Sequence, residues 1–280
     1  MRFFNSLKNC TFAAMLKKAF FLIAIVLVSG VLFSCSKYSR ISKSQDFQYK
    51  YQKALEYYDK GDYFHAMNLF DQVLPFFRGT EDAEKIAYKY SYAYYFQKEY
   101  IMASYHFNKF AKTYPRNDKA EECAFMSAYC KVKESPYYKL DQTNTFDAIR
   151  ELQLFINEYP ASDSLEACNR LIDEMRYKLQ RKDFEIAKLY LKMEKYNSSI
   201  AAFDNLLKKY PDTKFKEDAL FYSIKAHYYY ASKSVKGKRK ERYQQAVDIY
   251  KEFTRLYPES KYNRDIEYMV GKVNKDLKKL

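Results

Sequence analysis

The chain has 280 residues, with only 5 Gly and 6 Pro, no Trp, and an unusual abundance of aromatic residues, 31 Tyr and 22 Phe. This composition favours long helices and argues against a glycine-rich phosphate loop or a turn-rich β-sandwich. The formal net charge of +14 indicates mixed charge on helix faces, with attraction to anionic headgroups or an acidic partner as the alternative interpretation. A core does not need so many tyrosines, so some are expected to form an amphipathic binding surface.

The N-terminal segment 1–34 has the pattern of a secretory signal peptide. Two lysines precede an apolar run that ends at Phe33, and Ser34 and Cys35 follow it. A basic start, about 15 apolar residues and a small residue before the cleavage point are typical of such signals. The run is shorter than the roughly 20 residues that span a bilayer. Met15 is an alternative start of the chain. Because the protein is predicted to be secreted, nucleic acid is not an expected partner.

The stretch 32–35, Leu-Phe-Ser-Cys, resembles a bacterial lipobox. This resemblance implies that the Cys35 thiol is acylated and becomes the new N-terminus, with residues 35–45 as a flexible lipidated tether. Several acyl chains, each contributing roughly 0.8 kcal/mol per buried CH₂, would hold the protein on a membrane. The alternative is a cysteine that merely follows a signal anchor. By similarity to other lipoproteins, the residues after Cys35 favour an outer-membrane anchor that faces the periplasm.

The rest of the chain repeats one pattern five times. The dipeptide Tyr-Pro occurs at 114–115, 159–160, 210–211 and 257–258, and a small residue lies twelve positions before each proline. Bulky apolar residues follow that small residue at four and seven positions, and a first copy keeps this spacing without the proline. Such spacing forms one face of a helix, which proline then ends. The five sets are Ala66, Phe70 and Val73; Ala103, Phe107 and Phe110; Ala148, Leu152 and Phe155; Ser199, Phe203 and Leu206; and Ala246, Tyr250 and Phe253.

In its first two copies this pattern resembles the tetratricopeptide repeat (TPR). The residues that carry the resemblance are Ala54, Tyr57, Gly61, Tyr63, Ala66 and Phe70, and then Ser91, Tyr94, Tyr100, Ala103, Phe107 and Pro115. The resemblance implies an all-α, TPR-like superhelix, since one helix pair cannot bury its apolar face alone. The expected pairs are 46–78, 81–115, 118–160, 162–211 and 214–258, followed by a closing helix at 260–278. Lengthened loops are expected at 134–144 and 231–241.

In a TPR-like stack the first helix of each pair lines the concave face. In pairs 1–3 (residues 46–160) this predicts an aromatic groove suited to an extended apolar peptide. Its residues are Tyr51, Tyr58, Tyr88, Tyr92, Tyr95, Phe96, Phe125 and Tyr129. The alternative is that these rings only pack between lengthened helices.

The C-terminal half of the chain, residues 161–280, is more basic than the N-terminal half. Its candidate contacts with an acidic partner or anionic lipid are Lys236, Lys238, Arg239 and Lys240, in the expected loop 231–241. The alternative for these side chains is a solvated loop.

No group of residues predicts catalysis, a cofactor or a metal site. Cys123, Cys130 and Cys168 fall at small, buried helix positions, and the three histidines show no ligand spacing with them. The neighbouring carboxylates of Glu121 and Glu122 are interpreted as solvated helix faces. We therefore expect a protein that binds other proteins and is not an enzyme.

The lipobox, the tether and five lengthened TPR-like pairs together resemble the BamD family, the lipoproteins of the outer-membrane β-barrel assembly machinery. The resemblance covers about residues 35–280. It implies that the N-terminal pairs capture the C-terminal signals of unfolded β-barrel proteins, which end in an aromatic residue. It also implies that the C-terminal pairs dock on the periplasmic domains of the central subunit, the insertase.

Two other functions share the predicted anchor and fold. One is a TPR lipoprotein adaptor that coordinates cell-envelope growth, division or secretion complexes. The other is a glycan-binding surface lipoprotein, against which the absence of Trp counts.

Overall fold

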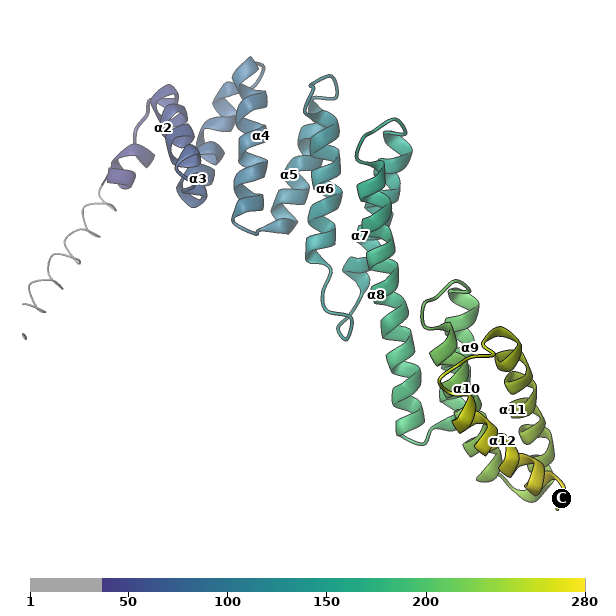
Figure 1. Cartoon of the computed structure of the whole chain (residues 1–280). Coiled ribbons are helices and arrows are strands. Elements are labelled where there is room, and N and C mark those ends of the chain that lie inside the picture. Colours follow the sequence, from purple (N-terminus) through teal and green to yellow (C-terminus); the bar gives the residue numbers. More distant parts are fainter. Residues whose placement is uncertain (1–36, 280) are drawn as a thin grey trace, which may run out of the picture. The chain divides into compact units, whose positions relative to one another are not determined.

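The structure is a computed structural model that describes residues 37–279, and every regular element in this range is a helix (Figure 1). The predicted signal peptide and Cys35 lie outside the described residues. The all-α prediction is confirmed. The elements are α2 (Phe47–Asp59), α3 (Tyr63–Val73), the 3₁₀ helix η1 (Leu74–Phe77), α4 (Glu81–Phe96), α5 (Tyr100–Thr113), α6 (Ala120–Glu134), α7 (Thr143–Glu158), α8 (Leu165–Lys192), α9 (Tyr196–Lys209), α10 (Lys216–Ser232), α11 (Lys236–Leu256) and α12 (Asn263–Leu277).

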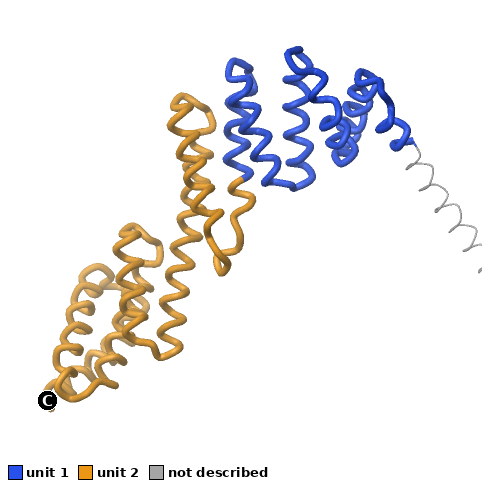
Figure 2. The backbone as a smooth tube through the Cα atoms, turned by 180° about the vertical axis from the view of Figure 1, so that it is seen from behind, with its two compact units in different colours: residues 1–130 blue, residues 131–280 orange. Residues whose placement is uncertain are grey.

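The chain divides into two compact units, residues 1–130 and residues 131–280 (Figure 2). Among the described residues, unit 1 holds α2 to α5 and most of α6, and unit 2 holds the end of α6 and α7 to α12. The division falls inside α6, before the boundary at 160 that separates the predicted halves. The repeat pattern locates helix pairs, and it carries no signal for the limits of a compact unit.

The predicted face of each second helix is buried. The five small residues are between 0% and 1% exposed, and nearly all of the bulky ones are equally enclosed. Tyr250 is the exception, since it is only partly buried. A small residue lets the paired helix approach closely, and the bulky residues fill the space that remains. The repeated spacing in the sequence is therefore the spacing of the core.

The four Tyr-Pro turns share one geometry. Tyr114, Tyr159, Tyr210 and Tyr257 each cap a helix C-terminus outside the helical region, with φ between −135° and −124° and ψ between 58° and 76°. Each tyrosine N–H donates to the carbonyl oxygen four residues earlier, at 2.8–2.9 Å. The residue before proline is excluded from the helical region by a clash with the proline ring. The sequence therefore ends α5, α7, α9 and α11 in the same way.

Three-residue turns join the two helices of pairs 1, 2 and 4. Their central residues, Gly61, Lys98 and Glu194, all have positive φ, at 77°, 62° and 59°. In the first turn the Asp62 carboxylate accepts the N–H of His65 and caps the N-terminus of α3. Glycine takes a positive φ without the steric cost that a side chain carries. The glycine at 61 marks this turn in the sequence, whereas the turns at 98 and 194 have no such mark.

The predicted flexible tether is ordered in the part that the structure describes. Residues 37–42 are helical, Ile41 is buried in the core, and Tyr38 packs against the Tyr57 ring with centroids 6.0 Å apart. The side chains of Tyr38 and Ile41 lie three positions apart and share one face of this short helix. The prediction of a flexible tether at 35–45 is therefore wrong for residues 37–42, because a mostly polar segment still carries an apolar face.

Candidate functional site

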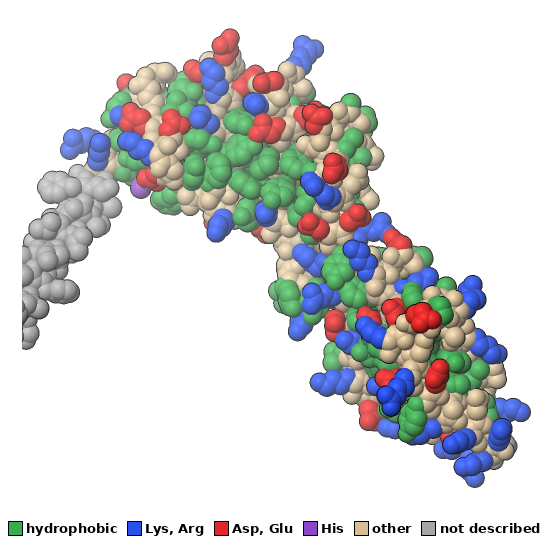
Figure 3. All heavy atoms as spheres, viewed as in Figure 1, with side chains coloured by type: hydrophobic (Ala, Val, Ile, Leu, Met, Phe, Trp, Pro, Cys, Tyr) green, Lys and Arg blue, Asp and Glu red, His purple; other side chains and the backbone are tan. Residues whose placement is uncertain are grey.

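Three first helices carry the predicted groove residues in unit 1. On α4, Tyr88, Tyr92, Tyr95 and Phe96 are spaced by four, seven and eight positions and lie on one face. Helix α2 supplies Tyr58, and α6 supplies Phe125 and Tyr129. We call these seven residues the aromatic face. Hydrophobic side chains gather where α4 to α6 lie in the space-filling view (Figure 3).

The rings of the aromatic face form one connected series. Phe96 lies 6.5 Å from Tyr58 and 5.8 Å from Tyr92, measured between ring centroids. Tyr95 lies 6.3 Å from Tyr92 and 6.4 Å from Tyr129. Phe125 stacks on Tyr129 at 6.0 Å, and Tyr88 lies 4.9 Å from Tyr92. These separations are within the range at which aromatic pairs attract one another.

Tyr51 does not belong to this series. Its side chain is 6% exposed and packs against the Phe77 ring at 5.2 Å. The prediction placed Tyr51 in the groove from its helix position alone, and the structure places it in the core. We therefore leave it out of the site.

Sequence reasoning missed two rings at the edge of the aromatic face. Tyr63 stacks on Phe96 at 4.5 Å, and Tyr100 lies 5.8 Å from Tyr95. Both are the first residues of second helices, α3 and α5. The signal was present, because a tyrosine stands three positions before the small residue in copies 1, 2, 4 and 5, the last two at Tyr196 and Tyr243.

Glu122 holds two hydroxyl groups behind the aromatic face. The Tyr88 hydroxyl donates to Glu122 Oε1 at 2.7 Å, and the Tyr92 hydroxyl donates to the same oxygen. Burial alone would raise the pKa of this carboxyl, but the two donated bonds hold it below its ordinary value. The interpretation of Glu122 as a solvated helix face was therefore incomplete: its side chain is 37% exposed and pairs with Lys119, but α6 also turns it toward α4.

Tyr58 and Tyr92, two tyrosines of this face, have a hydroxyl pKa above the ordinary value. Burial raises the pKa of Tyr58 to about 12, and burial with the bond to Glu122 raises the pKa of Tyr92 further. Phe96 is the most accessible ring, at 43% exposed. With the hydroxyls of Tyr88 and Tyr92 engaged internally, the face presents mainly ring surface. It is suited to noncovalent contact with apolar and aromatic side chains.

The predicted docking residues lie on a helix and not in a loop. Helix α10 ends at Ser232 and α11 begins at Lys236, so Lys236, Lys238, Arg239 and Lys240 occupy the first turns of α11. Arg239 donates to the carbonyl oxygen of Ser234 at 2.7 Å. The loop prediction for 231–241 was wrong because Lys, Arg and Glu are strong helix formers. One glycine, at 237, costs a helix only about 1 kcal/mol.

The remaining candidates from the sequence have structural explanations in the described residues. Cys123, Cys130 and Cys168 are fully buried, as predicted, and burial raises the pKa of the Cys123 thiol to about 12. Within residues 37–279, no three His, Cys, Asp or Glu side chains are placed to hold a metal ion. None of the helices described in this range is long and apolar enough to cross a membrane.

Comparison with known proteins identifies the family. The model of the outer membrane lipoprotein family YfiO matches residues 43–242. The outer membrane protein assembly factor BamD of Caulobacter vibrioides is 23% identical over 209 residues, 73% of this chain and 68% of its own. A protein of Aquifex aeolicus that also carries the name BamD is 27% identical over 228 residues, 80% of this chain and 74% of its own.

A solved structure, the TPR2AB domain of yeast Sti1 in complex with pHSP90, matches 81% of this chain and 98% of its own at 13% identity and a TM-score of 0.38. The family match covers most of the chain and includes the whole aromatic face. The fold and the site define a helical-repeat protein with a connected series of aromatic rings on its first helices. The chain belongs to the YfiO family of outer membrane lipoproteins.

Proposed function

We propose that this chain is a non-enzymatic outer-membrane protein assembly factor, anchored through acylated Cys35 and facing the periplasm. The names of its BamD relatives support this role, and they favour it over an adaptor for envelope growth, division or secretion. The protein captures the C-terminal signals of unfolded β-barrel proteins in unit 1. It then hands these proteins to the central insertase subunit for folding and insertion.

The observation that carries capture is the aromatic face. A barrel-protein signal that ends in an aromatic residue gains ring contacts and apolar burial there, each buried aromatic contributing about 0.5–1.5 kcal/mol beyond its area. Glu122 fixes Tyr88 and Tyr92 before any peptide arrives, which lowers the entropy lost on binding. The aromatic face offers few polar groups to a peptide, so it makes few hydrogen bonds with the peptide backbone. We therefore expect an affinity weak enough to permit release.

Handover rests on unit 2 and on the membrane anchor. Lys and Arg side chains are numerous on the face of unit 2 seen in Figure 3. In this proposal Lys236, Lys238, Arg239 and Lys240 contact acidic surfaces on the periplasmic domains of the insertase. Anchoring through Cys35 raises the effective concentration of the captured protein beside the insertase.

The test is the binding of a labelled peptide that ends in phenylalanine and is derived from a β-barrel protein. Tyr95→Ala combined with Phe96→Ala is expected to raise the dissociation constant of the peptide by about tenfold or more. Aromatic hot-spot residues contribute above about 1 kcal/mol each to binding. A fluorescence titration of the full chain in mild detergent measures this change.

The matched control is Ile101→Ala combined with Tyr105→Ala on α5. These two side chains are also large and exposed, but they lie outside the aromatic face. Their removal is expected to leave the affinity within about twofold. Equal loss in both double variants, or no loss in either, would remove the aromatic face from the proposed function.

A further inference from the structure

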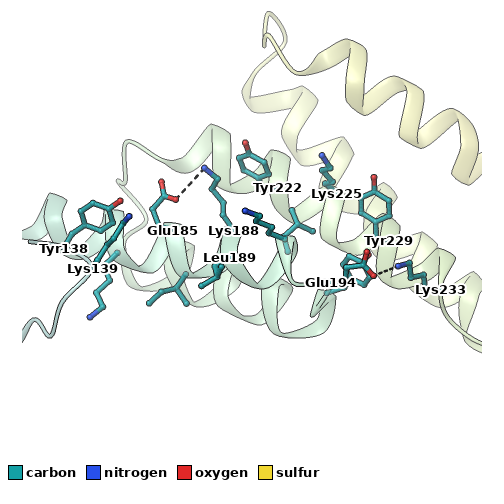
Figure 4. Close-up of a pocket in the computed structure, with 15 residues that line it drawn as sticks. Tyr138, Lys139, Glu185, Lys188, Leu189, Glu194, Tyr222, Lys225, Tyr229 and Lys233 are labelled. Carbon is teal, nitrogen blue, oxygen red and sulfur yellow. Dashed lines mark hydrogen bonds and ion pairs between the residues drawn. The ribbon is translucent and has the colours of Figure 1, made fainter.

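Unit 2 contains a candidate binding site that is separate from the predicted docking residues on α11. It is a cleft with a volume of about 960 Å³ between α8 and α10, bordered by Tyr138 and Lys139 from the loop after α6 (Figure 4). This volume is at the upper end of the range for ligand pockets in proteins, roughly 300–1,000 Å³. The cleft is therefore large enough for several side chains of a partner.

The residues that line the cleft recur at helical spacing, so they lie on one face of each helix. On α8, Glu185, Lys188, Leu189 and Lys192 lie on one face at spacings of three, four and seven. On α10, the lining residues Tyr222, Lys225 and Tyr229 follow the same rule. Both are first helices of neighbouring pairs, so the cleft follows the direction in which the pairs succeed one another.

The cleft carries a surplus of positive charge. Six lysines and two glutamates line it, and both glutamates are already engaged, Glu185 by Lys188 at 3.7 Å and Glu194 by Lys233 at 2.6 Å. Figure 4 shows both ion pairs, with Lys225 between two tyrosines. Within the described part of the chain, the side-chain nitrogens of Lys192 and Lys225 have no hydrogen bond or ion pair. Two ammonium groups are thus available to an acidic partner.

Apolar and aromatic side chains lie between the lysines that line the cleft. Leu189 is 52% exposed in the cleft, and Tyr229 stacks on Tyr196 at 5.6 Å. Lys188 lies over the Tyr222 ring, with its nitrogen 5.3 Å from the centroid. A small anion would leave these side chains uncovered, whereas a peptide covers both the charged and the apolar groups.

We propose that the cleft binds an extended acidic peptide segment whose carboxylates alternate with leucine-sized or aromatic side chains. The carboxylates pair with Lys192 and Lys225, and the apolar side chains cover Leu189 and the tyrosines. The site differs from the aromatic face in its unit, its charge and its ligand. It does not depend on the capture proposed for unit 1.

The test uses the full chain and a fluorescein-labelled peptide of alternating Glu and Leu, titrated at physiological salt. Lys192→Glu combined with Lys225→Glu is expected to weaken binding by about tenfold or more, since each reversal turns an attraction into a repulsion. Lys192→Glu alone, at an exposed position, serves as a second variant with an expected loss of about threefold. Circular dichroism confirms that each variant is folded.

The control variant is Lys208→Glu combined with Lys214→Glu, two exposed lysines of unit 2, which makes the same change in net charge outside the cleft and outside the proposed docking residues of α11. It is expected to keep the affinity within about twofold. A peptide of alternating Gln and Leu is expected to bind at least about tenfold more weakly than the acidic one. The proposal is overturned by equal loss in both double variants, by unchanged affinity in the cleft variants, or by equal binding of the Gln peptide.

A failure here leaves the function proposed for unit 1 intact. The phenylalanine-ended peptide reports on the aromatic face, and its affinity is expected to be unchanged by Lys192→Glu with Lys225→Glu. Loss of both peptides from this variant would indicate a general defect and contradict the assignment of two separate sites.

Discussion

Phe107→Ala is expected to lower the free energy of unfolding of unit 1 by about 3–5 kcal/mol, the usual cost of removing a buried phenylalanine ring. The Phe107 side chain is fully buried and packs edge-on against the Tyr92 ring, with centroids 4.9 Å apart. It belongs to a cluster with Ala103 and Phe110, the other two members of its repeat set. Denaturant unfolding followed by circular dichroism measures the change.

Ile101→Ala on the same helix is the matched control. Ile101 is 64% exposed, so its removal is expected to change the free energy of unfolding by no more than about 0.5 kcal/mol. Because Phe107 supports Tyr92, its removal is also expected to weaken peptide binding at the aromatic face. Similar stabilities for the two variants would contradict the assignment of the repeat positions to the core.

Acidification from pH 7 to pH 4 is expected to cost unit 1 about 3 kcal/mol through one residue, His106. Burial, with a smaller contribution from Lys109 and against the opposing charge of Asp71, lowers the pKa of His106 to about 4. Its ring stacks on Tyr94 at 4.8 Å, and Nε2 has no hydrogen-bond partner in the described structure. The folded pKa lies below the unfolded one. The neutral ring therefore contributes its full stability above about pH 6.5, and this contribution is lost as the pH falls toward 4.

His106→Phe isolates this contribution, because a phenyl ring keeps the stacking and does not titrate. Unfolding free energies of the two proteins are compared at pH 7 and pH 4. The original chain is expected to lose about 3 kcal/mol more than the variant between these values, while groups common to both cancel. An equal loss in the two proteins would show that His106 is protonated at no cost in the fold.

The repeat was predictable because its small and bulky residues recur at fixed short distances along the sequence. The small and bulky positions of each second helix, such as Ala148 and Leu152, are buried where the pattern placed them. The turns at Tyr-Pro followed from local backbone sterics. These features depend on residues within one helix and the next turn, so a single sequence contains the whole signal.

The features that could not be predicted from the sequence depend on contacts between residues of different helices. Glu122 resembles the many solvent-facing carboxylates of the sequence until α6 lies beside α4 and brings it to the hydroxyl of Tyr88. Tyr51 and Tyr58 lie on one helix with equivalent apparent positions, yet only Tyr58 joins the aromatic face. The cleft combines residues from α8 and α10 whose register against each other no sequence period encodes.

The most direct test of the proposed capture is site-specific photo-crosslinking from the aromatic face in cells. A photoreactive phenylalanine analogue replaces Phe96 in the full chain, and in a control it replaces Tyr105, which is exposed on α5 outside the face. Mass spectrometry then identifies the crosslinked peptides. We expect position 96, and not position 105, to capture C-terminal segments of β-barrel proteins. Absence of such segments at position 96, or their equal recovery at both positions, would contradict the proposed capture.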